Sequence, residues 1–399
     1  MKATPVAAVL DQVVLAYSPV FDRKLGVAAT RLTVFAVPGA GPVDGAALLN
    51  ALSEAFDDAP SQATTLPSVL LNVAHEAALD AVLAAAQREP RPFLIEVPAF
   101  LAGSRLPRLQ ALKQAGQVMA LASGLQADAA TRAPFRYLSL SSAECAQMKS
   151  KSALPLPWLC TAARSSAELD AALEQGAQAV AGWPMDDEIV LAKPAGVPPE
   201  VRGIVELMNR LEREEPPERL EAVLTSDPTL AFRLLRYLNS SAFGLRAEVT
   251  SFKHGLMMLG HKRLKRWLAL LLASGSPNRE ARVLMPVAAR RGLLLDELAR
   301  SGGDESMRAE MFICGVFSLI DRMLRQPMSV LMANLPVQDR VQKSLTAEGG
   351  PYGQYLDLAR ALEQGAASDI SAAAGAALVA RSEVNRALLK ALSLARELD

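Results

Sequence analysis

The sequence predicts two domains of different class, an α/β barrel in the first half of the chain and an all-helical domain in the second. Three observations support this prediction. Short apolar runs rich in β-branched residues recur up to residue 183, and most are separated by stretches with helical spacing. Strand-like runs almost disappear after residue 200. A chain of 399 residues is also too long for one ordinary domain.

Eight candidate strands in the first half predict a (β/α)₈ barrel. Each run is short and continuously apolar, as expected for strands buried on both faces. Capping boxes at Ser141-x-x-Glu144 and Ser165-x-x-Glu168 begin two of the intervening helices. A doubly wound open sheet is the alternative, and the segment is short for a barrel, which typically has about 250 residues. The candidate strands are residues 12–17, 31–37, 69–73, 93–97, 118–122, 137–140, 157–160 and 178–183.

A proline-rich linker separates the two predicted domains. Residues 192–199 hold three prolines and a glycine. We therefore expect a barrel domain over residues 1–193, a linker over 194–199 and a helical domain over 200–399. In the helical domain, Ser226-Asp227-Pro228 supplies an N-cap followed by proline at the first helical position. A later helix starts at residue 250 or 251 and ends at Gly260, and helical spacing continues over residues 282–299, 308–324 and 352–364.

Composition limits both the chemistry and the compartment. Lys and Arg together number 42, as do Asp and Glu, so there is no global attraction to nucleic acid or anionic lipid. No apolar run approaches the roughly 18 residues of a membrane span, and the N-terminus does not resemble a secretory signal. Three scattered cysteines suit a reducing cytoplasm, where we expect the protein. Three histidines leave little material for metal-dependent or acid–base catalysis.

Several stretches resemble known families. The segment YSPVFD at residues 17–22 resembles the opening strand of EAL domains, the barrel-fold phosphodiesterases of cyclic di-GMP, and residues 182–194 resemble the end of such domains. Residues 226–244, together with Ser251-Phe252 and Leu259-Gly260, are similar to HDOD domains. The chain as a whole resembles the two-domain EAL–HDOD signalling proteins of bacteria.

The resemblance implies that the EAL metal site is degenerate. Active EAL domains hold two divalent cations with several carboxylates and an Asn. The resemblance places the metal-binding Glu of the name-giving motif at Arg31, and it retains the Asn and Glu of the next two strands as Asn72 and Glu96. Two surviving ligands do not make a metal site, so we expect no catalytic residue, metal or cofactor. The other catalytic positions fall at Ala122-Ser123, Leu138 or Ser139, Thr161 and Ala181.

Arg31, Asn72 and Glu96 have two interpretations. Asn72 and Glu96 could be a polar pair at the strand ends that serves folding or solubility. Alternatively, all three could line a vestigial pocket that binds cyclic di-GMP without cleaving it. Arg31 could also contact another anion or lie in an interface. The sequence leaves these interpretations open.

The helical half also lacks the ligands of a hydrolase. HD-type phosphohydrolases, the relatives that give HDOD domains their name, hold metal with a His-Asp dipeptide and further histidines. No such dipeptide occurs in this sequence, and the resemblance places its position at Ser318-Leu319. A serine and a leucine do not replace an imidazole and a carboxylate as ligands. His254 and His261 are seven residues apart, which matches no ligand-pair spacing.

A basic cluster is the remaining candidate site. Lys262, Arg263, Lys265 and Arg266 lie opposite an apolar helix face, which predicts either a solvated face or a docking surface for an acidic partner. No recognition motif, aromatic stacking platform or global basic excess supports specific nucleic-acid binding. The sequence as a whole predicts a non-catalytic signalling adaptor that binds regulatory protein partners through both domains. The alternative is a non-hydrolytic cyclic di-GMP receptor, and less favoured is a residual phosphodiesterase or metal phosphohydrolase.

Overall fold

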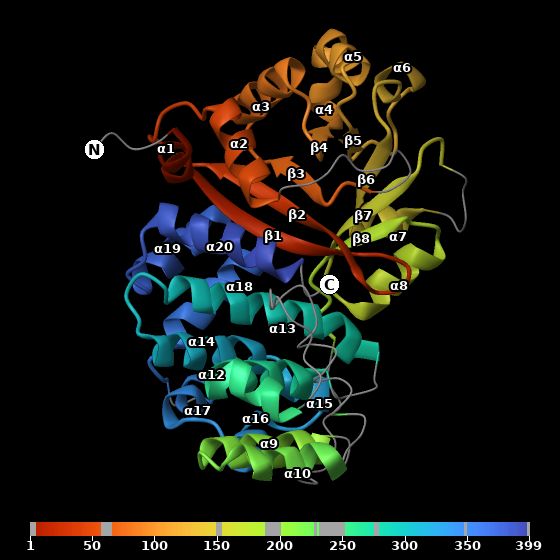
Figure 1. Ribbon diagram of the computed structural model, residues 1–399. Coiled ribbons are helices and arrows are strands. Elements are labelled where there is room, and N and C mark those ends of the chain that lie inside the picture. Colours follow the sequence, from red (N-terminus) through yellow and green to blue (C-terminus); the bar gives the residue numbers. More distant parts are fainter. Residues whose placement is uncertain are drawn as a thin grey trace. The chain divides into compact units, whose positions relative to one another are not determined.

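The computed structural model describes residues 5–56, 66–148, 154–187, 201–226, 230, 252–274, 279–346 and 349–396. The chain forms two compact units, residues 1–187 with 360–390 and residues 188–359 with 391–399. Strands occur only in the first unit among the described residues, and the second is built from helices (Figure 1). The predicted linker at 194–199 lies outside the described residues.

Eight strands close into a barrel in the order of the sequence, which confirms the predicted barrel over the open sheet. Each of the eight predicted runs falls on one strand, because a continuous apolar run suits a strand covered on both faces. The strands are β1 (Val13–Phe21), β2 (Val27–Ala36), β3 (Val69–Val73), β4 (Phe93–Pro98), β5 (Met119–Ala122), β6 (Tyr137–Ser141), β7 (Trp158–Ala163) and β8 (Ala179–Gly182).

The first strand runs antiparallel to both of its neighbours, β2 and β8. Only residues 22–26 connect β1 to β2, and the Asp22 carboxylate accepts a hydrogen bond from the Gly26 amide to form a tight turn. A parallel connection would need a crossover of about a dozen residues or more. The other adjacent pairs are parallel, so the carboxyl ends of β2 to β8 share one rim. The start of β1 lies at this rim, because Val13 pairs with Ala36.

One layer of apolar side chains fills the barrel interior, and every strand contributes to it. Side chains alternate between the two faces of a strand, so the residue two positions later along β2 to β8 points inward again, nearer the rim. This second layer contains the positions of the degenerate metal site. The interior layer consists of Val20, Ala29, Leu70, Leu94, Ala120, Tyr137, Leu159 and Ala179, and Ala181 of the second layer belongs to the same apolar cluster.

Short helices follow most of the strands, consistent with a barrel built from fewer residues than usual. The Ser141 capping box is confirmed, since the Ser141 side chain accepts from the Glu144 amide and the Glu144 carboxylate accepts from the Ser141 amide. Ser165 caps its helix through the Glu168 amide. The helices are α1 (Pro5–Gln12), α2 (Gly45–Ala55), α3 (Glu76–Arg88), α4 (Ala99–Ala102), α5 (Leu106–Gln114), α6 (Ala129–Arg132), α7 (Ser142–Gln147) and α8 (Ser166–Glu174).

A segment from the far end of the sequence also belongs to the barrel unit. Residues 360–390 comprise the end of α18 (Gly353–Gln364), all of α19 (Ala367–Ala376) and most of α20 (Arg381–Ala395). Helix α19 packs against β1. The sequence places these residues in the helical domain, whereas the compact unit that contains them is the barrel.

The second unit is an array of helices. Gly260 has a left-handed φ of 68° and interrupts α12, where the sequence predicts the end of a helix. Helices α13 and α14 approach closely at Gly315, where a Cβ would lie 2.6 Å from the Arg291 carbonyl oxygen. The predicted N-cap at Asp227-Pro228 and residues 231–251 lie outside the described residues. The helices are α9 (Arg202–Glu212), α10 (Pro217–Ser226), α12 (Phe252–Ala273), α13 (Arg279–Leu298), α14 (Glu305–Phe317), α15 (Ile320–Leu324), α16 (Met328–Asn334), α17 (Asp339–Leu345) and the start of α18.

Candidate functional site

The candidate site lies in the second inward-facing layer, at the rim of the barrel. Arg31 projects from β2, Asn72 from β3 and Glu96 from β4. The strand register makes Asn72 the neighbour of both Thr33 and Glu96. The fold therefore brings together the three site residues that the sequence singles out.

Arg31 and Glu96 form a two-pronged ion pair. Arg31 Nε donates to Glu96 Oε1 at 2.8 Å, and a terminal nitrogen donates to Oε2 at 2.7 Å. The Glu96 side chain is only 1% exposed and that of Arg31 is 19% exposed. Burial lowers the pKa of Arg31, but the charge of Glu96 and its hydrogen bonds more than compensate, so the net pKa of Arg31 is raised. The guanidinium therefore remains charged and keeps both carboxylate oxygens bonded.

Thr33 extends this pair into a small polar network that includes Asn72. Its hydroxyl oxygen accepts from Asn72 Nδ2 at 3.3 Å and from an Arg31 terminal nitrogen at 3.5 Å. Thr33 is not among the site residues expected from the sequence. Its position two residues after Arg31 on the same strand is the signal that places both side chains on one face.

The remaining rim positions carry no carboxylate or imidazole. Ser139 and Thr161 are buried, and the Thr161 hydroxyl donates to the Leu140 carbonyl oxygen at 3.2 Å. Ala122 and Ala181 have no polar side-chain atom. Among the described residues, no cluster of three or more His, Cys, Asp or Glu could hold a metal ion. With a guanidinium bonded to both oxygens of the Glu96 carboxylate, this donor set does not fit a pair of divalent cations.

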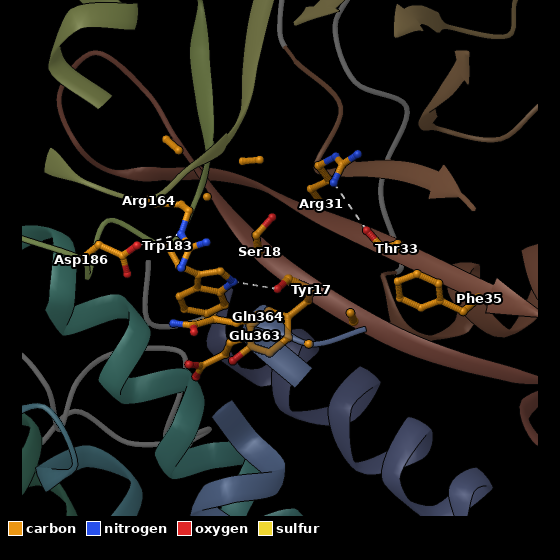
Figure 2. Close-up of a pocket in the computed structure, with 15 residues that line it drawn as sticks. Tyr17, Ser18, Arg31, Thr33, Phe35, Arg164, Trp183, Asp186, Glu363 and Gln364 are labelled. Atoms are coloured by element: carbon orange, nitrogen blue, oxygen red, sulfur yellow. Dashed lines mark hydrogen bonds and ion pairs between the residues drawn. The ribbon is translucent and has the colours of Figure 1, made fainter. Parts of the chain in front are cut away.

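A pocket of about 340 Å³ opens beside the ion pair within the barrel unit. Figure 2 shows Arg31 and Thr33 on one side of it and Trp183 with Asp186 on the other. The Trp183 indole nitrogen donates to the Tyr17 carbonyl oxygen at 3.0 Å, and the two rings meet edge to face at 5.1 Å. This contact fixes an aromatic wall for the pocket.

Two further parts of the pocket are formed by residues that the sequence does not predict as site residues. Arg164 and Asp186 form an exposed ion pair at 2.7 Å. Glu363 and Gln364, at the end of α18, line another side (Figure 2), together with Gly365 just after the helix. Nothing in the local sequence indicates that residues so far along the chain reach the barrel rim.

Most of the predicted basic patch is neutralised inside the helical unit. Three of its four members form ion pairs, and Arg266 also lies over the Phe312 ring at 5.0 Å. Arg263 is exposed. Lys262 lowers the pKa of Glu305 through a hydrogen bond and its charge. The patch therefore offers an acidic partner less unpaired charge than the sequence suggests. The pairs are Lys262–Glu305, Lys265–Glu212 and Arg266–Asp296.

Ser318 and Leu319, where the resemblance places the His-Asp dipeptide, have structural roles. Ser318 caps the end of α14, and its hydroxyl donates to the Gly315 carbonyl oxygen at 2.7 Å. Arg291 donates to the same hydroxyl at 2.9 Å, and Leu319 is buried. These side chains serve packing and the helix end.

Comparison with protein families decides the nature of the helical part. Residues 197–327 match the HDOD domain family. The chain carries an HDOD domain. The HDOD half of the predicted pair is thereby confirmed, and the closed barrel agrees with the EAL-like half.

Two curated proteins are similar to part of this chain. The chain is 30% identical over 162 residues to the uncharacterized protein YuxH of Bacillus subtilis, covering 40% of this chain and 39% of that protein. It is 27% identical over 146 residues to the cyclic di-GMP phosphodiesterase CdgJ of Vibrio cholerae, covering 37% and 34%. The matches thus span well under half of each relative.

Solved EAL structures resemble the chain over a similar share. The phosphodiesterase PaMucR in complex with cyclic di-GMP matches 44% of this chain and 96% of its own, at 17% identity and a TM-score of 0.31. The EAL domain of FimX from Pseudomonas aeruginosa, bound to cyclic di-GMP, matches 46% of this chain and 95% of its own, at 13% identity and the same TM-score.

Among the described residues, no helix is both long enough and apolar enough to cross a lipid bilayer.

Proposed function

We propose that this chain is a non-catalytic component of cyclic di-GMP signalling that works by binding regulatory proteins. The combination of an EAL-like barrel and an HDOD domain supports a place in this signalling system. One relative is named a cyclic di-GMP phosphodiesterase, which supports the same assignment. The side chains at the barrel rim most directly support one part of the proposal, that the chain does not hydrolyse cyclic di-GMP.

The ion pair between Arg31 and Glu96 carries the proposal. A phosphodiesterase of this kind needs divalent cations beside the Glu96 carboxylate. A fixed guanidinium about 4 Å from such an ion would repel it by about 4 kcal/mol per unit of charge, or about 8 kcal/mol for a divalent cation. Arg31 therefore supplies the positive charge that Glu96 needs, in a form that activates no water.

The hydrogen-bonded polar side chains of the rim support an adaptor role. The ion pair, together with Asn72 and Thr33, satisfies the buried polar groups of the rim without an ion. The barrel can therefore present its outer surface to another protein without an ion bound at the rim. The HDOD domain adds a second surface on the same chain, so one molecule can hold two partners together.

A hydrolysis assay tests the absence of catalysis. The full chain is incubated with cyclic di-GMP and Mg²⁺ or Mn²⁺, and chromatography follows the linear dinucleotide. An active EAL phosphodiesterase in the same buffer is the positive control. We expect no product above the protein-free blank. Product that scales with protein concentration, and is lost in Glu96→Gln, would refute the proposal.

The pocket beside Arg31 favours one second candidate, a non-hydrolytic receptor for cyclic di-GMP. Its aromatic wall of Tyr17 and Trp183 and its volume of about 340 Å³ suit part of a small ligand. Calorimetric titration of the full chain decides the matter. Binding in the micromolar range or tighter, weakened by Trp183→Ala, would support the receptor, and a flat titration removes it.

A further inference from the structure

Among the described residues, the edge of β1 that faces β8 lacks a strand partner over most of its length. Strand β8 pairs with β1 only at Val20 and Phe21, although β1 begins at Val13. An unpaired edge exposes backbone donors and acceptors that need other partners. Side chains meet this need, because the Trp183 indole donates to the Tyr17 carbonyl oxygen.

Asn385 of α20 satisfies the edge of β1 nearest the rim. Its side-chain nitrogen donates to the carbonyl oxygens of Leu10 and Val13, both at 2.8 Å, and its side-chain oxygen accepts from the Leu15 amide at 3.1 Å. The residue is only 1% exposed. A side-chain amide has the same donor and acceptor groups as a peptide, so Asn385 replaces part of a missing neighbouring strand.

Arg381, one turn before Asn385, adds a second attachment. A terminal nitrogen donates to the Asp11 carbonyl oxygen at 3.0 Å. Leu10 and Asp11 lie in the last turn of α1, whose carbonyl groups have no partner within the helix. The two side chains of α20 therefore hold the junction between α1 and β1.

The same C-terminal segment also reaches the pocket beside Arg31. Glu363, which is 5% exposed, lines the pocket with Gln364 and Gly365. Glu363 and Gln364 end α18, which begins among the residues of the helical unit, and Gly365 directly follows the helix. Helix α20 likewise continues into residues of that unit after Lys390.

We propose that residues 360–390 act as a strap on the barrel: the hydrogen bonds of Asn385 and Arg381 hold them on β1, and in that position they restrict access to the rim pocket. Both ends of the strap continue into the helical unit, so a change there that loosens the strap would open the pocket. The proposal holds whether or not the barrel is catalytic.

Amide hydrogen exchange on the unaltered full chain gives the first test. Exchange is measured at increasing low concentrations of urea, so that each peptide reports its opening free energy and its dependence on urea. We expect the strap and residues 10–17 to open together as one cooperative group. The proposal is overturned if the strap opens with α13 and α14, or if the Leu15 amide, whose partner is Asn385, stays protected when the strap opens.

A thiol probe in the pocket gives the second test. Cys145, Cys160 and Cys314 are buried, so Ser18→Cys adds one thiol at the pocket wall whose labelling depends on access to the pocket. Its labelling rate with a maleimide is compared in the presence and absence of Asn385→Ala. Loss of three buried hydrogen bonds should raise the rate by at least about tenfold.

Two further variants distinguish release of the strap from general unfolding. Lys390→Ala changes an exposed residue of the same helix and should leave the rate unchanged. Arg381→Ala removes one weaker attachment and should raise the rate less than Asn385→Ala. Unchanged labelling in both Asn385→Ala and Arg381→Ala refutes the strap, as does an equal rise in Lys390→Ala.

Discussion

Removal of Arg31 should destabilise the barrel far more than removal of an exposed arginine with equally good geometry. Arg31→Met strands a carboxylate that is 1% exposed, and breaking a buried pair in this way costs about 3–5 kcal/mol. Arg164→Ala is the matched control, because Arg164 also contacts its carboxylate, that of Asp186, at 2.7 Å. Those side chains are 70% and 45% exposed, so their pair should contribute no more than about 1 kcal/mol.

The double variant separates the ion pair from general packing. Glu96→Gln in the Arg31→Met background removes the stranded charge, so the double variant should recover about 2 kcal/mol or more relative to Arg31→Met. This recovery is not expected if Arg31 contributes only its aliphatic stem.

Urea unfolding of the full chain measures these differences. Trp158 and Trp183 belong to the barrel unit, whereas Trp267 belongs to the helical unit. In a Trp267→Phe background, indole fluorescence therefore reports on the barrel. If Arg31→Met loses no more stability than Arg164→Ala, the inference that Arg31 replaces a cation at the rim is wrong.

Two further predictions concern pH. The hydrogen bond from Arg105 lowers the pKa of Asp80 below its usual 3.8. This stabilisation is therefore present above pH 3.8 and is lost as pH falls through the folded-state pKa. The difference in melting temperature between the wild type and Arg105→Ala should shrink as pH falls below 3.8, and a constant difference would contradict this. Burial, followed by the hydrogen bond to Glu310, raises the pKa of Tyr352 from 10 to about 12. The free energy of unfolding should therefore fall between pH 10 and 12. Tyr352→Phe should be about 1–3 kcal/mol less stable at neutral pH and should lack this tyrosine-dependent fall. Urea titrations followed by Trp267 fluorescence measure both effects.

The strands were predictable because their burial on both faces leaves a local trace in the sequence. Each apolar run marks one strand, and the Ser141 capping box marks one helix start. The reversed direction of β1 was also within reach, since residues 22–26 are too few for a crossover. Strand direction therefore depends on connection length as well as on apolar pattern.

The candidate site was predictable in position and unpredictable in contacts. The resemblance and the alternation of strand side chains place Arg31, Asn72 and Glu96 in one layer. The ion pair between Arg31 and Glu96 forms between side chains of β2 and β4, which are not adjacent strands. No local sequence pattern predicts such a contact. Asn385 lies 370 residues from its partner Leu15, so its contact leaves no signal near either residue.

The side-chain cap on β1 has a consequence for any shortened form of the protein. A chain ending at residue 187 would retain all eight strands but lose Asn385 and Arg381. The free carbonyl of Val13 and the free amide of Leu15 would then be available to a strand of another molecule, and exposed edges of this kind promote aggregation. Such a fragment should self-associate through β1 even though its barrel sequence is intact, so the C-terminal helices also protect the barrel's solubility.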